Sequence, residues 1–226
     1  MSDLNPPAAE GLSRLSHGLK TPLALIAGYA ELLTIKRDDE TLEEAPRRIR
    51  EATADLMRIV DDLLTVYAID ANVLYLAPVP TSVGSVVDGA LDAARERGTV
   101  VSIDADDASR GAEIVADPDY ARAMIETLVE NARNRAANSG AAVHVERAGG
   151  FVRIEVGDLG GDLSEQERAG AFDAFSRLQP RTGLTTGLEL YKVRRLAELQ
   201  RGHVWVDDAA DAETRFGFAL PLAHPA

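Results

Sequence analysis

The sequence predicts a two-domain α+β protein, with a long helical hairpin first and an α/β sandwich after it. Apolar residues recur in steps of three and four over residues 8–35 and again over residues 41–70, which is the spacing of one helix face. Beyond these stretches, shorter helical patterns alternate with strand-like runs, which is typical of helices packed on one face of a sheet. The two domains are expected to comprise residues 1–71 and 72–226.

The hairpin follows from the polar cluster at 36–39, which interrupts the apolar pattern between the two predicted helices. Pro46 suggests that the regular part of the second helix begins near that residue, since proline suits a first turn. A lone hairpin cannot bury the apolar stripes of both helices, so we expect a second copy to complete a four-helix-bundle dimer.

The second domain is predicted from a mixture of short patterns. The segment 72–81 carries two prolines and predicts a short strand and a linker, and the glycine pair at 149–150 predicts a turn between two strands. Helices are expected over 83–97, 119–138 and 187–200, and strands over 99–104, 142–147, 151–158, 203–207 and 214–221.

The composition excludes several classes of function. The formal net charge of −13 argues against nucleic acid and against anionic lipid, because both need a basic surface. Without cysteine the chain has no disulfide and no thiolate metal site, and its histidines lack the i, i+4 spacing of a zinc hydrolase. The N-terminus does not read as a signal peptide, and no stretch approaches the roughly 18 apolar residues of a membrane span. We therefore expect no direct membrane insertion and a cytoplasmic location.

The most informative segment is 15–23, which reads LSHGLKTPL. His17 falls between two apolar positions of the first helix, so we expect it to point outward from the bundle, with Thr21 one turn later on the same face. Pro22 lacks a backbone N–H and its ring crowds the preceding turn, so the helix should bend beside His17. A solvated neutral imidazole is nucleophilic near pH 7, which makes His17 a candidate phosphoryl acceptor.

This segment resembles the phosphoaccepting H-box of histidine kinases, Ser-His-Glu-x-x-Thr-Pro-Leu. The resemblance implies that His17 is the phosphorylated residue. In a phosphoryl transfer through His17, Lys20 is the candidate to neutralise the charge of the phosphoryl group, and Thr21 is the candidate to position water for dephosphorylation. Lys20 stands where the family usually has arginine. The matching positions are Ser16, His17, Thr21, Pro22 and Leu23.

One position of this motif departs from the family. The family places an acid directly after the histidine, where it orients the ring and serves proton transfer, and here that position is Gly18. Loss of a general base commonly lowers a rate by about 100- to 10,000-fold. Self-phosphorylation is therefore expected to be weak, while His17 keeps the capacity to accept phosphate from a receiver domain.

The rest of the chain resembles the ATP-binding domain shared by histidine kinases, gyrase and the related heat-shock chaperone, which implies an α/β sandwich of the histidine kinase/gyrase ATPase type. Residues 124–132 read MIETLVENA and resemble the N-box, which implies that Asn131 is an oxygen ligand of a Mg²⁺ shared with ATP phosphates. Residues 156–162 read VGDLGGD and resemble the G1 box, Asp-x-Gly-x-Gly. That match implies that Asp158 accepts a hydrogen bond from the adenine amino group and that Gly160 lets the backbone approach the base.

Two further blocks follow in the family's order. Residues 171–177 read AFDAFSR and resemble the F-box, and residues 183–188 read GLTTGL and resemble the G2 box, Gly-x-Gly-x-Gly-Leu. The second match implies that Gly183 and Gly187 cradle phosphates, since glycine-rich turns let backbone N–H groups converge on an anion.

These blocks also depart from the family at the nucleotide contacts. Asn134 replaces a basic residue, and Arg133 and Arg135 flank it as the candidates to supply the missing charge. Asp162 replaces the second glycine of the G1 box, where a carboxylate would repel a polyphosphate, and Thr185 replaces the middle glycine of the G2 box. Together with the missing acid after the histidine, these changes predict lost or reduced kinase activity.

Three functions remain open from the sequence. In the first, the chain is a degenerate histidine kinase or histidine phosphotransferase, in which His17 passes a phosphoryl group to or from the aspartate of a response-regulator receiver domain. In the second, it is an active but slow kinase core, and ATP and Mg²⁺ are its cofactors if the nucleotide site is functional. In the third, it is a non-catalytic dimeric adaptor that binds a regulator. A relay or an adaptor needs no cofactor of its own.

Overall fold

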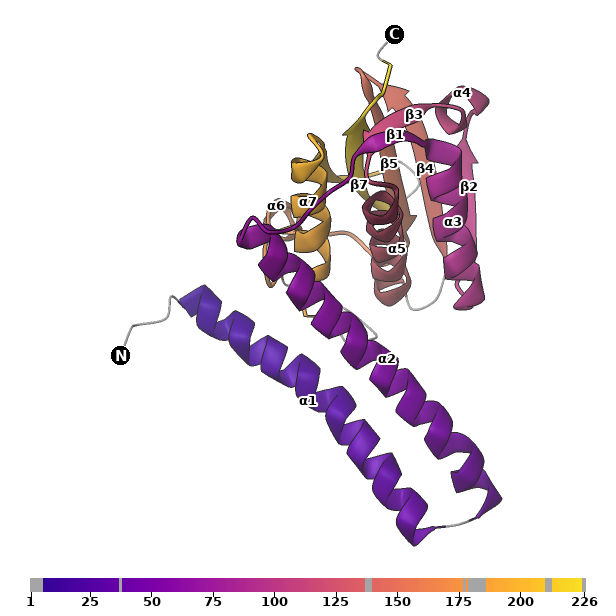
Figure 1. The fold of residues 1–226 in the computed structure, drawn as a ribbon, viewed down its shortest axis with the longest axis vertical. Helices are drawn as coiled ribbons and strands as arrows, with labels where there is room; N and C mark the ends of the chain where they lie inside the picture. Colours follow the sequence, from indigo (N-terminus) through magenta and orange to yellow (C-terminus); the bar gives the residue numbers. More distant parts are fainter. Residues whose placement is uncertain are drawn as a thin grey trace.

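The computed structural model describes residues 6–36, 38–136, 140–176, 178, 186–209 and 213–224, and for residues 6–12 and 14 it describes the backbone alone. A long hairpin of two helices projects from a compact second domain (Figure 1). Within the described ranges, no helix is both long and apolar enough to cross a membrane.

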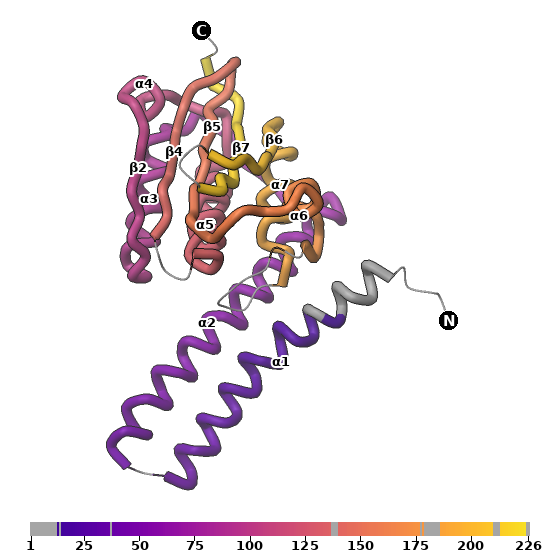
Figure 2. The backbone as a smooth tube through the Cα atoms, turned by 180° about the vertical axis from the view of Figure 1, so that it is seen from behind, coloured from indigo at the N-terminus to yellow at the C-terminus, as the bar shows by residue number. Residues whose placement is uncertain are grey.

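The hairpin consists of α1 (Pro6–Ile35) and α2 (Asp39–Asp70), which run antiparallel and side by side in both views (Figures 1 and 2). The helix α2 begins at Asp39, close to the start of the apolar pattern at residue 41, but the expectation that its regular part begins near Pro46 is wrong, because Pro46 lies inside it. The Asp38 carboxylate caps this end by accepting the Thr41 backbone N–H at 2.8 Å, and acidic residues fill the first turn. Both features stabilise a helix N-terminus and offset the one hydrogen bond that proline removes.

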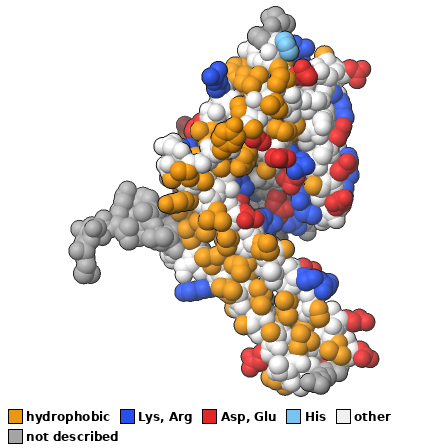
Figure 3. Space-filling model, viewed as in Figure 1, with side chains coloured by type: hydrophobic (Ala, Val, Ile, Leu, Met, Phe, Trp, Pro, Cys, Tyr) orange, Lys and Arg blue, Asp and Glu red, His pale blue; other side chains and the backbone are white. Residues whose placement is uncertain are grey.

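The helix α2 has two apolar faces with different surroundings. Ala45, Ala52 and Ile59 recur every seven residues and are buried, and Ile59 lies against the α1 turn that contains Gly18. A second stripe on α2 is exposed, and Figure 3 shows hydrophobic side chains running along the hairpin. That stripe consists of Met57, Val60, Leu64 and Tyr67.

The last turn of α2 belongs to the second domain as much as to the hairpin. Ile69 is buried in the hydrophobic core of that domain, so the end of α2 is fixed there. The chain then runs through the segment 71–78 into the first strand.

The second domain contains every predicted helix and strand, with boundaries shifted by a few residues. Its elements are β1 (Val79–Ser82), α3 (Val83–Glu96), β2 (Val101–Ala105), α4 (Asp107–Arg110), β3 (Glu113–Ala116), α5 (Pro118–Arg135), β4 (Ala141–Ala148), β5 (Phe151–Asp158), α6 (Glu165–Ala169), α7 (Glu189–Leu199), β6 (His203–Asp208) and β7 (Thr214–Pro221). The sequence did not predict α4, β3 or α6, because each is too short to show a period.

These elements form two layers, which confirms the predicted α/β sandwich. The main sheet has the strand order β2-β4-β5-β7-β6, in which β2 pairs with β4 in parallel and the other neighbours are antiparallel. The helices α3, α5 and α7 cover one face of this sheet, as the two opposite views show (Figures 1 and 2). A separate antiparallel pair, β1 with β3, lies at one end.

The core lies between that helical layer and the sheet. Alternate residues of β5 point into it and meet the apolar face of α5, as the strand period of two and the helix period of 3.6 require. The residues that meet there include Val152, Ile154, Val156, Met124, Ile125 and Leu128, all essentially inaccessible to solvent. This packing fixes the C-terminal end of α5 next to the C-terminal end of β5, where the G1-box residues follow.

Shortening one core side chain on α7 tests this packing. Leu196 is 0% exposed and Leu199, on the same helix, is 44% exposed. We expect Leu196→Ala to lower the free energy of unfolding by about 2–5 kcal/mol, because it removes buried methyl groups and leaves a cavity. Leu199→Ala should change it by about 0.5 kcal/mol or less. Urea unfolding followed by circular dichroism measures both, and equal losses would contradict the described layer.

Candidate functional site

The imidazole of His17 lies on the exposed side of α1, as expected from its position between two apolar residues. The Thr21 hydroxyl donates a hydrogen bond to the His17 backbone carbonyl at 3.0 Å, one turn below it. Lys20 is also exposed, whereas Gly18 and Pro22 are buried on the opposite side of the helix. The three residues predicted for phosphoryl transfer therefore share one accessible stretch of α1.

Gly18 lies where the hairpin touches the second domain. A Cβ placed on it would stand 3.6 Å from Cγ2 of Thr186, in the segment before α7, and 3.9 Å from Cδ1 of Ile59 on α2. A methyl group fits at these distances, but a longer side chain would have to push the two elements apart. The glycine that replaces the family's acid therefore lies in a close contact beside His17.

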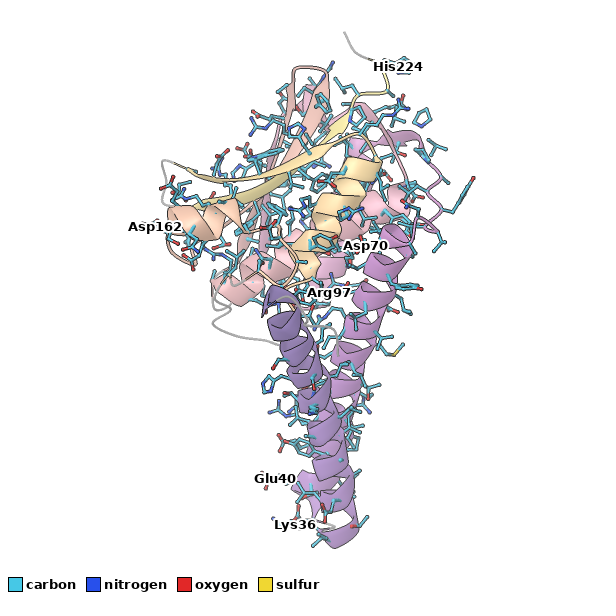
Figure 4. The ribbon with its side chains drawn as sticks, turned by 90° about the vertical axis from the view of Figure 1, so that its left-hand side faces the viewer. Lys36, Glu40, Asp70, Arg97, Asp162 and His224 are labelled. Atoms are coloured by element: carbon cyan, nitrogen blue, oxygen red, sulfur yellow. The ribbon has the colours of Figure 1, made fainter. Side chains whose placement is uncertain are left out.

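Polar contacts hold the hairpin against α7. The Lys192 ammonium pairs with the buried Asp62 carboxylate, and Nη1 of Arg195 lies 2.7 Å from Oδ1 of Asp70. The Tyr191 hydroxyl donates to the same Asp70 oxygen at 3.2 Å. Figure 4 shows Asp70 at the end of α2 next to the second domain. These contacts span the last three turns of α2.

A cavity of about 530 Å³ lies between α2, α5 and α7. Asn131, Arg135, Gly187 and Glu189 all line it, so the N-box and the G2 box face the same space. The amide Nδ2 of Asn131 is buried there and has no hydrogen-bond partner among the described residues. The volume is in the usual range for a small-molecule site.

Glu130, next to Asn131, is ionised at the edge of this cavity. Burial acts to raise the pKa of its carboxyl, but hydrogen bonds and charge from Arg133, with further charge from Arg58, hold that pKa below its usual range. Arg133 Nε donates to Glu130 at 3.0 Å, and Arg58 Nη1 lies 3.7 Å away. Within the described ranges no group of three or more acids or histidines is placed to hold a metal ion, so Mg²⁺ at Asn131 stays a prediction.

Asp158, the candidate adenine acceptor, is closed off by an internal partner. Nε of Arg135 lies 3.0 Å from Oδ2 and 3.3 Å from Oδ1 of Asp158, and the Gly160 backbone N–H donates to Oδ1 at 2.7 Å. The two side chains are buried, with Arg135 5% exposed and Asp158 2% exposed. Burial raises the pKa of the Asp158 carboxyl above its ordinary value, and Arg135 and the Gly160 N–H act in the opposite direction.

Arg135 makes two further contacts that fix its orientation. Its Nη2 donates to the Gly161 carbonyl at 2.9 Å, and its guanidinium lies over the Phe216 ring, 5.3 Å from the centroid. A Cβ on Gly160 would lie 2.8 Å from Cβ of Arg135. The same Cβ would lie 2.7 Å from Oδ1 of Asp158, so the close approach of this turn to the end of α5 requires glycine here.

The two arginines that flank Asn134 are both engaged within the chain. Arg133 is held by Glu130, and Arg135 points into the protein toward Asp158. Asn134 itself is buried, with its Nδ2 3.5 Å from Oε1 of Glu130. The helical step of about 100° explains this, because consecutive residues leave α5 in different directions.

The segment before α7 keeps one of the predicted glycines in a demanding conformation. Gly187 has φ +77°, and a Cβ there would lie 2.8 Å from Cα of Phe175, so only glycine is accommodated. Gly183 and Thr185 lie outside the described residues, and the roles assigned to them stay predictions. Asp162, the substituted G1-box position, is exposed next to α6 (Figure 4).

Glu189 occupies the backbone donors of this segment. Its carboxylate accepts the Gly187 N–H at 2.9 Å and the Thr186 N–H at 2.8 Å, and the Thr186 hydroxyl donates to it at 3.1 Å. Glu189 was not among the site residues predicted from the sequence. The available signal was an acid in the first turn of a predicted helix, directly after a glycine-rich loop.

Two family models match the chain at these sites. Residues 10–72 match the His Kinase A (phospho-acceptor) domain, and residues 116–224 match the "Histidine kinase-, DNA gyrase B-, and HSP90-like ATPase" family. The chain belongs to the two-component histidine kinase family. His17 and the cavity therefore lie in the two domains that define such a core.

Individual relatives agree with this assignment. The circadian input-output histidine kinase CikA of Synechococcus elongatus is 25% identical over 228 residues, which cover 96% of this chain and 30% of CikA. The Acinetobacter baumannii histidine kinase AdeS has a similar fold, with a TM-score of 0.68 at 17% identity, over 92% of this chain and 98% of that one. Full-length ShkA in complex with AMPPNP matches with a TM-score of 0.67 at 25% identity, over 96% of this chain and 46% of ShkA. The chain thus spans about a third of the length of CikA.

The residues of this histidine kinase core do not fit ATP as they stand. The carboxylate expected to accept a hydrogen bond from the adenine amino group is buried under Arg135. Of the two glycines expected to bind phosphate, Gly187 has its N–H bonded to Glu189, and Gly183 lies outside the described residues. Asn131 is the one predicted nucleotide contact in the described ranges with a polar atom left unpaired. A nucleotide would first have to displace the chain's own groups.

A methyl group at Gly18 tests the contact beside His17. We expect Gly18→Ala to raise the free energy of unfolding by about 1 kcal/mol, because alanine loses less backbone entropy in a helix and its Cβ fits beside Thr186. Gly28→Ala is the matched control on α1, since a Cβ there has no neighbour within 4 Å. Thermal unfolding of both variants gives the answer. A gain for Gly28→Ala with a loss for Gly18→Ala would mean a tighter contact than described.

Proposed function

We propose that this core passes a phosphoryl group through His17, to or from the aspartate of a response-regulator receiver domain, and that its ATP-dependent autophosphorylation is weak. One combination of features supports this most directly. The candidate acceptor is exposed on α1, while two of the groups expected to hold ATP, the Asp158 carboxylate and the Gly187 N–H, are engaged within the chain.

The proposed transfer is a displacement at phosphorus. A neutral imidazole nitrogen of His17 attacks the phosphoryl group of an aspartyl phosphate, an N–P bond forms, and the O–P bond breaks to release the aspartate carboxylate. Such a reaction needs mainly alignment and neutralisation of charge. In this proposal Lys20 supplies positive charge one turn from His17, and the receiver supplies the divalent cation. The reverse reaction uses the same groups.

The proposal includes a homodimer formed through the hairpin. His Kinase A domains form dimers, and the exposed apolar stripe on α2 supports a dimer of this chain. Its members are spaced three, four and three residues apart, which is the pattern of a helix seam. A second hairpin laid against this stripe would complete a four-helix bundle.

Charges on the stripe test the dimer. We expect Leu64→Glu with Tyr67→Glu to convert a dimer into a monomer, because two carboxylates would be buried without partners in the interface. Val100→Glu is the control, an equally exposed apolar position in the second domain. Light scattering after size-exclusion chromatography measures the molar mass. A monomeric wild type, or a doubly substituted variant that stays dimeric, would count against the proposed interface.

Replacement of the acceptor tests the phosphoryl transfer. Receiver domains labelled with radioactive acetyl phosphate are mixed with wild type, His17→Ala and His224→Ala, of which the last alters an exposed histidine near the C-terminus. We expect acid-labile label on wild type and on His224→Ala and none on His17→Ala. Binding of the receiver by all three without label on any would favour an adaptor.

The same preparations separate relay from kinase when they are incubated with radiolabelled Mg-ATP. The proposal expects little label on wild type over times at which transfer from the receiver is complete. Fast acid-labile labelling that His17→Ala abolishes would instead identify an active kinase.

A further inference from the structure

We propose that Arg135 and Glu189 act as internal stand-ins for the two ends of a nucleotide, so that ATP binds only by displacing both side chains. This inference deepens the proposed function, because it names the cause of weak ATP use. It rests on contacts within the second domain and not on any property of His17.

At the first end, a guanidinium takes the place of the base. Asp158 has no exposed carboxylate oxygen to offer, since Arg135 and the Gly160 N–H together occupy both oxygens. The arginine is held in turn by the Gly161 carbonyl and the Phe216 ring. A ligand that bound this carboxylate would first have to displace the buried guanidinium of Arg135.

At the second end, a carboxylate takes the place of a phosphate. The N–H groups of Thr186 and Gly187 point at a common anion, and that anion is the Glu189 side chain. These donors stand just before α7, whose dipole also favours negative charge at that end. Because Glu189 is only two residues beyond Gly187, it competes with any free anion as an intramolecular ligand.

Both stand-ins line one retained cavity. Arg135 and Glu189 border the space of about 530 Å³ between α2, α5 and α7, together with Asn131 and its unpaired amide. The space is large enough for a small molecule. However, Arg135 occupies the carboxylate expected to bind the base, and Glu189 occupies backbone N–H groups before α7. The cavity is therefore closed by specific contacts and not by loss of volume, and removal of those contacts should reopen it.

Two alanine substitutions test this directly. We expect the double variant Arg135→Ala with Glu189→Ala to bind Mg-ATP at least tenfold more tightly than wild type, by calorimetric titration of the purified full chain. Each single substitution should give part of that gain. Matched controls are Arg122→Ala, an exposed arginine on the same helix that pairs with Asp119, and Glu198→Ala, a glutamate on the same helix as Glu189 that pairs with Arg195.

Circular dichroism establishes that each variant is folded before titration. If Arg135→Ala unfolds because Asp158 is left buried and unpaired, Glu189→Ala carries the test alone, with an expected gain of at least threefold. Unchanged affinity in the folded variants, or an equal gain in the two controls, would overturn the inference. So would a wild type that already binds as tightly as the double variant.

The test is independent of the relay. Transfer of label from a phosphorylated receiver to His17 needs no ATP, so its failure beside a gain in ATP affinity would reject the proposed function alone. Successful transfer with no gain in affinity would reject the stand-ins alone.

Discussion

The buried ion pair of Arg135 with Asp158 holds together the edge of the second domain where α5 and β5 end. It joins the last residue of α5 to the last residue of β5, and so ties the helical layer to the sheet at the cavity. A pair of this kind adds little net stability, yet loss of one partner typically costs about 3–5 kcal/mol because the other charge stays buried. Gly160 packs against the same residues, since a Cβ there would collide with Oδ1 of Asp158 and with Cβ and the backbone carbonyl carbon of Arg135.

The second constraint is the contact between the hairpin and α7. Asp62 is buried on α2 and would be costly there without Lys192, so this pair selects one placement of the hairpin on the domain. Gly18 then lies against Thr186, in the same segment that Glu189 binds. The helix that carries His17 and the segment before α7 therefore lie close together at Gly18 and Thr186, with His17 on the adjoining exposed face.

Much of the fold could be predicted from the sequence, because it depends on periods that extend over many residues. The two hairpin helices, the three long helices of the second domain and five of its strands all follow from such periods. Pro46 misled the prediction, since a strong cap at Asp38 outweighed the preference of proline for a first turn. The short elements α4 and α6 are set by local capping residues, which a periodic pattern does not show.

The site was less predictable, because a motif locates a candidate residue but does not show which side chains it contacts in the folded protein. Asp158 was identified from its motif, yet its partner Arg135 lies 23 residues earlier, and the pairing exists only once α5 packs on β5. From the sequence, Arg135 was only a flanking arginine at a different angle around the helix from Asn134, and its pairing with Asp158 was not predicted. Glu189 lies within a few residues of its donors, but its role depends on the positive φ of Gly187, which the sequence alone does not reveal.

The anchored end of α2 has a mechanical consequence. With 32 residues at about 1.5 Å each, α2 is a rod about 48 Å long, and Ile69 clamps one end of it into the core of the second domain. A tilt of about 10° at that clamp would displace the far tip by about 8 Å, as simple leverage on a rod of that length. A force applied at the tip would therefore act on the contacts of Asp62 and Asp70 together. It would be multiplied by the ratio of the distance between clamp and tip to the distance between clamp and contact.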